Sequence, residues 1–596
     1  MVFLQALLFI IISSVQFVML ELFFGKNIFE YSADIVIKNV LLIMLVNLIV
    51  SSVIHKMKPA LIITDIFFLI VGIANYFVIL FRGYGIVFMD FYAIKTAATV
   101  AGNYSYDINK YFIAAVLTGI VSIVFMVILL KVTKGEKRRY FDVREILKSL
   151  TGIAVALLFI LWINMDTVFF KDVTSLSWDH SIGIEECGYI LYFTANAGEA
   201  SVQKPDGYSA EKVEKVLSKY EQKDNEQCAD EDKPNVIMIM NESFADLRVL
   251  GDIETDKSVM PFFDSLSENT IKGYAQSSVY GGYTANSEFE FLSGCSKAFL
   301  PGNPYLQYID DYMPGLISNL KKQGYDNAVA IHPYNASGYN RNRVYPLMYF
   351  DEFLTKDDFR GEEKVRDYIG DLEDYQKIEE LYEKKEAGER LCVFNVTMQN
   401  HNPYNDYSYQ FKEPVRVTSF LSSSNVNEYL SLMKMSDDAL RELITYFKNV
   451  DEKTLIVLFG DHQPHLPDQF YCDLMGKNPT QFTQEDTMTK HMVPFVIWAN
   501  YDIPEMTIEK VSVNYLSSIF LNVSGLKMSD YNRYLLDLYQ TLPVISAPGY
   551  YDKAGNLYEL SDSKSEYNEL LNQYEMIQYN YLFDKDNRLD KHYQIR

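Results

Sequence analysis

The sequence predicts a multi-pass helical membrane domain followed by a soluble α/β domain with a mostly parallel central sheet. Three observations support this fold class. The first ~170 residues are dominated by apolar runs, whereas the rest is mixed and carries most of the acidic residues. In the second part, short continuous apolar runs alternate with helical patterns, as expected for strands buried on both faces. Polar side chains, several of them histidines, follow the ends of these runs.

Composition excludes some classes of protein. The chain has 596 residues and a formal charge of −24, with no basic stripe, which argues against a nucleic-acid-binding protein. Its five cysteines are scattered and show no CxxC spacing. This spacing excludes a cysteine-type zinc module and gives no sign of a disulfide framework.

Five apolar segments are long enough to cross a bilayer, which takes about 20 residues. They lie at 2–24, 34–54, 60–81, 111–131 and 149–170. The first segment lacks the charged start of a signal peptide and is followed by more spans, so we interpret it as a span.

Basic residues in the short loops predict the orientation. Lys56 and Lys58 lie between spans two and three, and a second basic group that includes Lys134, Arg138 and Arg139 lies between spans four and five. Cytoplasmic placement of both loops requires a cytoplasmic N-terminus. With five spans, everything after ~170 is then extracellular, and the protein is a multi-pass component of a plasma membrane.

The remaining sequence predicts three further parts. Residues 171–232 contain a helical pattern at 210–220 and a charged stretch, which suits a linker. Residues 233–530 form the α/β domain, and 531–596 form a tyrosine-rich C-terminal extension without evident chemistry. Strands are predicted at 235–240, 328–331, 391–397, 454–459 and 494–498, separated by helices at 310–323, 375–387 and 426–448.

Thr284 follows Gly281-Gly282-Tyr283 and begins a helical pattern in which Phe289 and Leu292 recur at helical spacing. A helix start directs free N–H groups and a positive dipole end at its surroundings, which suits a phosphate. A hydroxyl at this point is a candidate nucleophile if a metal or a base activates it. An ordinary N-cap is the alternative that this residue alone leaves open.

Ligands in parallel sheets gather beyond the carboxyl ends of the strands. The first predicted strand is followed by Glu242 and the fourth by the pair Asp461-His462. Carboxylate oxygens and imidazole nitrogens are ligands for zinc or manganese. The second and third strands are followed by His332 and His401, so one sheet edge gathers several groups suited to a metal and a phosphate.

The ordered set of motifs resembles the lipoteichoic acid synthase family. The motifs are N-E-S-F after the first strand, G-Y-T at the helix start, then H-N-P-Y and G-D-H, all behind a five-span membrane part. The resemblance covers the chain to about residue 530. It implies an extracellular domain with the sulfatase and alkaline-phosphatase fold.

Carried over by motif, the resemblance implies one divalent cation, commonly manganese in the family, with magnesium or zinc as alternatives. It would be held by Glu242, Thr284, Asp461 and His462, with Thr284 as the nucleophile. Three further residues would bind glycerol-phosphate: His401 of H-N-P-Y, and His332 with Arg341 of an H-x₈-R segment. Tyr339 stands where the family usually has a tryptophan that contacts the substrate.

The activity that the resemblance implies is transfer of glycerol-phosphate from a membrane lipid, such as phosphatidylglycerol, through a covalent threonine intermediate. The acceptor would be a glycolipid or a growing lipoteichoic acid chain. Because Gly-Gly-Tyr-Thr-Ala-Asn differs from the family's best-known pattern, transfer to another cell-envelope glycan is an alternative.

Three rival functions make different demands. A true sulfatase needs a Cys or Ser in a C/S-x-P-x-R motif, which does not surround Thr284. A hydrolytic phosphatase or phosphodiesterase with two metals needs more Asp and His ligands than the pattern supplies. A binding protein with a degenerate site predicts gaps among the ligands, yet all four positions hold competent residues.

Overall fold

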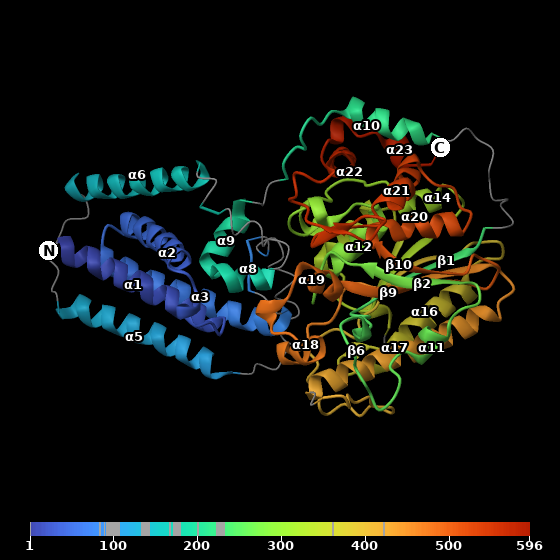
Figure 1. The fold of residues 1–596 in the computed structure, drawn as a ribbon, viewed down its shortest axis with the longest axis horizontal. Helices are drawn as coiled ribbons and strands as arrows, with labels where there is room; N and C mark the ends of the chain where they lie inside the picture. Colours follow the sequence, from blue (N-terminus) through green and yellow to red (C-terminus); the bar gives the residue numbers. More distant parts are fainter. Residues whose placement is uncertain are drawn as a thin grey trace. The chain divides into compact units, whose positions relative to one another are not determined.

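The computed structural model describes residues 2–82, 85–88, 90, 108–132, 143–165, 169–170, 180–198, 202–221, 233–359, 361, 363–420 and 423–595. The chain divides into two compact units. The first comprises residues 1–91 and 104–201, and the second 92–103 and 202–596. Figure 1 shows helices in the first unit and a sheet covered by helices in the second.

The first unit is built from apolar helices. They are α1 (Val2–Phe23), α2 (Ala33–Ile54), α3 (Met57–Arg82), α5 (Lys110–Val132) and α6 (Val143–Met165). Within the described residues, the first four are long and apolar enough to cross a membrane, and they confirm four of the five predicted spans. The fifth predicted span falls on α6, whose apolar stretch covers only Ser149–Trp162, so a count of five spans is not confirmed. The basic residues of 133–142, used to predict the orientation, lie outside the described residues.

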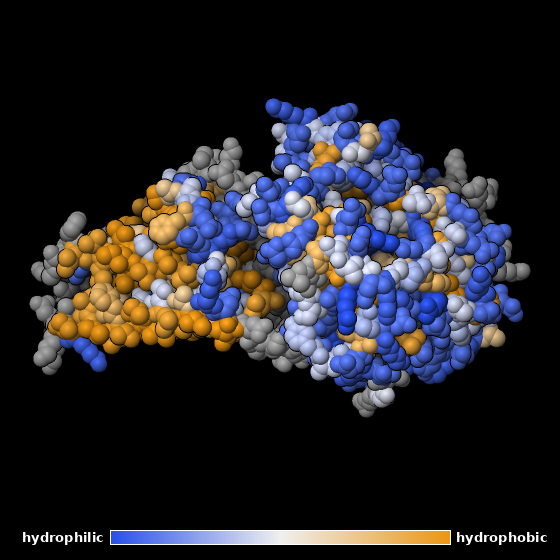
Figure 2. All heavy atoms as spheres, turned by 60° about the horizontal axis from the view of Figure 1, so that its bottom comes forward, coloured by the Kyte–Doolittle hydropathy of each residue, from blue (hydrophilic) through white to orange (hydrophobic). Residues whose placement is uncertain are grey.

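Buried polar side chains connect the apolar helices to one another. The Gln16 amide donates to Asp65 Oδ1 at 2.8 Å, and the Ser122 hydroxyl donates to Asp65 Oδ2 at 2.8 Å. Asn47 donates to Gln16 Oε1 at 2.7 Å, so α1, α2, α3 and α5 share one network. On the face of the first unit that Figure 2 shows, most of the surface is hydrophobic (orange). This division suits helices that associate inside a bilayer.

Part of the predicted linker belongs to the first unit. Helices α8 (His180–Cys187) and α9 (Tyr189–Gly198) are held by two side chains of the apolar helices. Asn39 donates to the Cys187 carbonyl at 2.8 Å and accepts from Leu191 N–H at 2.9 Å. Glu21 Oε1 accepts from Tyr189 N–H at 2.9 Å. Helix α10 (Ala210–Leu217) is part of the second unit.

The second unit contains an eight-stranded sheet in the order β10-β2-β9-β8-β1-β7-β3-β4. β9 runs against β2 and β8, and the other pairings are parallel, which confirms a mostly parallel sheet. The strands are β1 (Asn235–Asn241), β2 (Thr270–Gln276), β3 (Ala328–His332), β4 (Glu352–Thr355), β7 (Cys392–Val396), β8 (Thr454–Gly460), β9 (Met492–Ala499) and β10 (Met506–Ser512).

Two hydrophobic cores cover the faces of this sheet. Side chains alternate along β1, with Met238 in one core and Ile239 in the other. Figure 1 shows α12, α20, α21 and α22 on one side and α11, α16 and α17 on the other. The helices are α11 (Pro261–Ser265), α12 (Thr284–Ser293), α13 (Pro304–Gln307), α14 (Leu316–Lys321), α15 (Arg341–Leu347), α16 (Asp371–Lys384), α17 (Ser424–Lys448), α18 (Asp468–Met475), α19 (Gln484–Lys490), α20 (Val513–Val523), α21 (Asp530–Thr541), α22 (Asn568–Leu582) and α23 (Asp590–Tyr593).

The tyrosine-rich C-terminal residues pack on this domain. The rings of Tyr581 and Tyr593 stack with centroids 4.3 Å apart, and both belong to the same hydrophobic core as α12. Short strands β11 (Val544–Ser546), β12 (Gly549–Tyr551) and β13 (Leu557–Tyr558) form a separate small sheet here. β5 (Lys364–Val365) and β6 (Tyr368–Ile369) pair in another.

Candidate active site

Thr284 is the first residue of α12 and is not its N-cap. The N-cap is Tyr283, whose side chain makes no capping hydrogen bond. Three successive residues, Gly281, Gly282 and Tyr283, have positive φ of 66°, 156° and 63°, so the turn needs its glycines. The Thr284 hydroxyl donates to Glu242 Oε2 at 3.3 Å and lies 3.5 Å from His462 Nε2. The turn therefore directs this hydroxyl at the predicted metal ligands.

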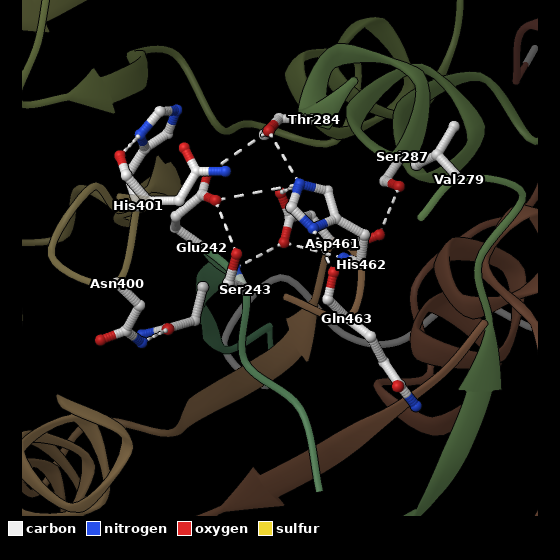
Figure 3. A network of polar contacts seen from close by, with 12 residues as sticks. Glu242, Ser243, Val279, Thr284, Ser287, Asn400, His401, Asp461, His462 and Gln463 are labelled. Atoms are coloured by element: carbon white, nitrogen blue, oxygen red, sulfur yellow. Dashed lines mark hydrogen bonds and ion pairs between the residues drawn. The ribbon is translucent and has the colours of Figure 1, made fainter. Parts of the chain in front are cut away.

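Glu242, Asp461 and His462 converge from the ends of β1 and β8, which are neighbours in the sheet (Figure 3). Each offers one ligand atom, and these atoms lie within 4.8 Å of one another. Asp461 Oδ1 accepts from the N–H groups of Ser243 and His462, both at 2.8 Å. The Ser243 hydroxyl donates to Glu242 Oε1 at 2.9 Å. Neighbouring residues thus fix both carboxylates.

The residues present fit a divalent cation. Asp461 Oδ2 is a buried oxygen without a hydrogen-bond partner, and it lies 3.1 Å from His462 Nε2. Burial, followed by the charge of Asp461, raises the pKa of Glu242 well above its usual value. Two buried carboxylates side by side, joined by an imidazole nitrogen and a hydroxyl, form a donor set that manganese, zinc or magnesium accepts. Thr284, Glu242, Asp461 and His462 are the residues that would hold it.

Backbone carbonyls set the same tautomer in three histidines. Nδ1 lies 3.0 Å from the Gln463 carbonyl in His462, 2.6 Å from the Asn402 carbonyl in His401, and 2.9 Å from the Val396 carbonyl in His332. Because a carbonyl can only accept, each Nδ1 carries the proton and each Nε2 keeps its lone pair. Burial lowers the pKa of His401 to about 4, so this imidazole is neutral at neutral pH. It can accept a proton from an alcohol, but it is not suited to protonate a leaving group.

Arg341 begins α15 in a buried ion pair with Glu288 of α12. Nε donates to both carboxylate oxygens, at 3.0 and 3.2 Å, and Nη2 also contacts Oε1. Tyr339 packs its ring 5.3 Å from the guanidinium carbon. The predicted substrate residues Arg341 and Tyr339 therefore touch each other, and Nη1 takes no part in the ion pair.

Arg366 is a residue of the site that sequence reasoning missed. Its Nη1 donates to the Pro403 carbonyl at 2.7 Å, and its Nη2 donates to the Gln399 and His401 carbonyls at 2.8 Å. One guanidinium thus holds the H-N-P-Y loop that carries His401. Arg366 stands in the turn between the short paired strands β5 and β6, and nothing in its local sequence indicates this role.

Two residues of α12 were also missed by sequence reasoning. Asn286 is buried, and its Oδ1 has no hydrogen-bond partner. Glu288 lies one turn beyond Thr284. Helical spacing from Thr284 could have indicated Glu288.

Backbone strain also concentrates at the site. Among the described residues, five of the eight non-glycine residues with positive φ belong to it: Ser243, Tyr283, Tyr339, Asn340 and Arg366. Strain of this kind persists where the surroundings fix it, as at functional sites.

Comparison with known proteins identifies the fold. Residues 234–526 match the sulfatase family model. A Rhizobium meliloti (strain 1021) protein named for the modification of cyclic β-1,2-glucan is 30% identical over 408 residues, which cover 66% of this chain. The matched region spans 62% of that relative, which is less than two thirds of its length.

Two solved structures are similar over long stretches. Lipooligosaccharide phosphoethanolamine transferase A (EptA), an integral membrane protein from Neisseria meningitidis, is 14% identical with a TM-score of 0.52, covering 88% of this chain and 96% of that one. The phosphoglycerol transferase GacH from Streptococcus pyogenes, solved with sn-glycerol-1-phosphate, is 21% identical with a TM-score of 0.49, covering 66% and 99%.

The second unit is thus a sulfatase-type domain, as the resemblance to the lipoteichoic acid synthase family implies. The chain joins this domain to helices that are long and apolar enough to cross a membrane, and 88% of it shares the fold of EptA.

Proposed function

We propose that the protein transfers glycerol-phosphate from a membrane phospholipid, phosphatidylglycerol being the simplest donor, to a hydroxyl group of a cell-envelope glycan. The observation that carries the proposal is the Thr284 hydroxyl, which stands at a helix start against Glu242 and His462. A plain N-cap would accept a backbone N–H, whereas this hydroxyl donates into the carboxylate cluster.

In the first half-reaction, the threonine receives the glycerol-phosphate group. Thr284 Oγ1 attacks phosphorus, and its proton passes to Glu242 Oε2, which already accepts the hydroxyl hydrogen bond. The Oγ1–P bond forms and the P–O bond to diacylglycerol breaks, and the departing oxygen takes a proton from solvent. The N–H groups at the start of α12 and Arg341 stabilise negative charge on the phosphoryl oxygens.

In the second half-reaction, the threonine passes the glycerol-phosphate group to the acceptor. A glycan hydroxyl attacks the glycerophospho-Thr284, and its proton passes to Nε2 of His401, the ring nitrogen that carries no proton when Nδ1 donates to the Asn402 carbonyl. The new P–O bond forms as the Oγ1–P bond breaks. Thr284 regains its proton from Glu242, and His401 releases its proton to solvent, which restores the proton given to diacylglycerol. A divalent cation, when bound by Glu242, Asp461, His462 and Thr284, lowers the pKa of the hydroxyl and screens the charge of the phosphate.

The charges beside the aromatic side chains favour a neutral head group. Arg366 and Lys356 lie 5.6 and 6.0 Å from the ring centres of Tyr368 and Tyr334, and the Tyr368 ring lies 5.6 Å from that of His401. An ammonium group such as that of ethanolamine would meet these cations at the ring faces it would otherwise seek. The glycerol of phosphatidylglycerol meets no such repulsion.

The sequence relative supports a glycan as acceptor, since its name refers to the modification of a cyclic glucan. A growing lipoteichoic acid chain or a glycolipid is the second candidate, favoured by the order of the N-E-S-F, G-Y-T, H-N-P-Y and G-D-H motifs. Both acceptors belong to the cell envelope, so we place the sulfatase-type domain outside the cell and the N-terminus in the cytoplasm. Manganese is the proposed cation.

The test uses the full-length protein in phospholipid vesicles with phosphatidylglycerol labelled in its head group and manganese present. We expect label on Thr284 in the peptide map when acceptor is withheld, and label on a β-glucan oligosaccharide when it is added. Thr284→Ala should abolish both signals. Phosphatidylethanolamine as donor, a glycolipid as acceptor, or release to water alone would each replace the proposed function with a related one.

A further inference from the structure

Glu288 is a buried carboxylate on α12 that no step of the proposed reaction uses. It lies four residues after Thr284, so the two residues share a helix face one turn apart. Its side chain is fully buried, at 0% exposure. An isolated carboxylate is costly to bury, so its partners explain why the position holds a glutamate.

The partners of Glu288 occupy both of its oxygens. Arg341 Nε reaches Oε1 at 3.0 Å and Oε2 at 3.2 Å, and the Tyr345 hydroxyl donates to Oε2 at 2.7 Å. The Arg341 side chain is only 3% exposed, so the ion pair has almost no contact with solvent. Charge-assisted bonds in such surroundings fix geometry strongly.

This pairing determines where the rest of the guanidinium points. The group is a rigid plane with five N–H donors, and Glu288 engages Nε and Nη2. Nη1 is left at the edge away from the carboxylate. The Tyr339 ring covers the guanidinium, and the strained residues Tyr339 and Asn340, with φ of 52° and 57°, set the backbone before it.

Arg341 also acts on another predicted substrate residue. Burial is the main cause of the low pKa of His332, and the charge of Arg341 is the next. The guanidinium therefore lies within electrostatic reach of His332.

We infer that Glu288 is a positioning residue that aligns the phosphate-binding edge of Arg341 with Thr284. Glu288 belongs to the helix that begins with Thr284. One rigid element therefore carries the nucleophile and also orients the Arg341 guanidinium, which binds the phosphoryl oxygens. The inference rests on the proposed function and deepens it. It predicts that loss of Glu288 impairs turnover, while Arg341 keeps its charge and continues to attract the phosphate.

The test compares Glu288→Gln, Arg341→Gln and the double variant, with Glu290→Gln as the matched control. Glu290 lies on the same helix and is equally buried, but it accepts from Ser278 and the Lys297 N–H. In Glu288→Gln we expect kcat to fall about 10²-fold, as for a small misplacement of a reacting group, with KM unchanged or lower. Arg341→Gln should lower kcat and raise KM, and Glu290→Gln should stay within about 3-fold of wild type.

The double variant separates positioning from general structural support. If Glu288 acts through Arg341, the double variant should be no slower than Arg341→Gln alone. Multiplied losses, a Glu288→Gln defect confined to KM, or wild-type kcat in Glu288→Gln would overturn the inference. If Glu288→Gln does not fold, Tyr345→Phe removes one hydrogen bond from the same carboxylate and should lower kcat about 3- to 10-fold with unchanged KM.

Both transfer from phosphatidylglycerol and hydrolysis of bis(p-nitrophenyl) phosphate should be measured on the full-length proteins. Wild-type protein that cleaves only the artificial diester contradicts the proposed function, and the variants then test the alignment on that diester. If the wild type transfers glycerol-phosphate but the losses in kcat of the two single variants multiply in the double variant, only the inference is contradicted. Wild-type protein inactive on both substrates overturns both.

Discussion

The two sides of the proposed active site, the proposed metal ligands and the proposed substrate residues, are held in different ways. On the metal side, Glu242, Asp461 and His462 directly follow strands, and residues next to them in the chain or on the adjoining strand fix their carboxylates. On the substrate side, Arg341 depends on Glu288, 53 residues away, and the His401 loop depends on Arg366, 35 residues away. The metal side is thus fixed by local contacts at the strand ends, whereas the substrate side is fixed by buried contacts between residues far apart in the chain.

This difference predicts that substitutions on the metal side lower activity the most. Asp461→Asn keeps the shape of the side chain and its acceptor for the N–H groups of Ser243 and His462, but removes the negative charge. We expect activity to fall at least about 10³-fold, because the cation and the threonine that it activates are lost together. Bound manganese, measured by mass spectrometry of the purified protein, should fall in parallel.

Asp468→Asn provides the matched control, since this exposed aspartate lies seven residues further on, at the start of α18. It should bind manganese and turn over as the wild type does. An Asp461→Asn protein that keeps both its metal and its activity would contradict the assignment of the metal side.

Arg366→Lys tests the substrate side at its main long-range contact. A lysine carries one ammonium in place of a planar fork, so it cannot reach the Gln399, His401 and Pro403 carbonyls together. We expect kcat/KM to fall about 10²-fold because His401 is displaced, while manganese content stays at the wild-type level. Arg416→Lys, at an exposed position, is the control. Loss of metal in Arg366→Lys would show that the two sides are not held independently.

The same difference explains which parts of the site could be predicted from sequence. Glu242 and the Asp461-His462 pair follow apolar runs whose identity as buried strands is a local property, and strand ends meet at one edge. Arg366 could not be found in this way, because its partners come from a loop more than thirty residues later and its own segment has no periodicity. Glu288 lay within reach of helical spacing, but its partner Arg341 is set by tertiary packing.

The fold shows a similar limit. The buried strands β1, β3, β7, β8 and β9 were predicted, while β2, β4 and β10 were missed. β2 contains Lys272 and Gly273 in an alternating pattern, and β4 and β10 are edge strands with exposed residues. Such strands are stabilised by their neighbours in the sheet more than by a continuous apolar run.

Tyr339 tests a smaller contribution on the substrate side. Its ring packs on the Arg341 guanidinium at 5.3 Å, a contact worth about 0.5–2 kcal/mol. Tyr339→Ala should therefore lower kcat/KM about 3- to 30-fold, and Tyr339→Trp should retain or exceed wild-type activity. Both changes keep a side chain at the same positive φ, so the backbone strain is comparable. Equal losses in Tyr339→Ala and Tyr339→Trp would exclude stacking as the role of this residue.

The smallest expected effect concerns pH and stability. Burial lowers the pKa of His401 to about 4, below the value of ~6.5 in an unfolded chain. Between these values the unfolded state binds a proton that the folded state does not, so this residue makes stability rise with pH across the window. Glu242 and Asp461, whose pKa values are raised, act in the opposite sense in an overlapping range, so the wild-type profile alone does not isolate His401.

The difference between wild type and His401→Gln isolates the histidine. Glutamine cannot take up the proton, so the variant should lose less stability than the wild type between pH 6.5 and 4.5, by about 2 kcal/mol. Melting temperatures of the two full-length proteins, taken at several pH values, measure this difference. If the melting temperatures of the two proteins change equally with pH, His401 is accessible enough to be protonated in the folded protein. It could then donate a proton as well as accept one. A smaller loss in the variant would support the neutral imidazole that the second half-reaction needs.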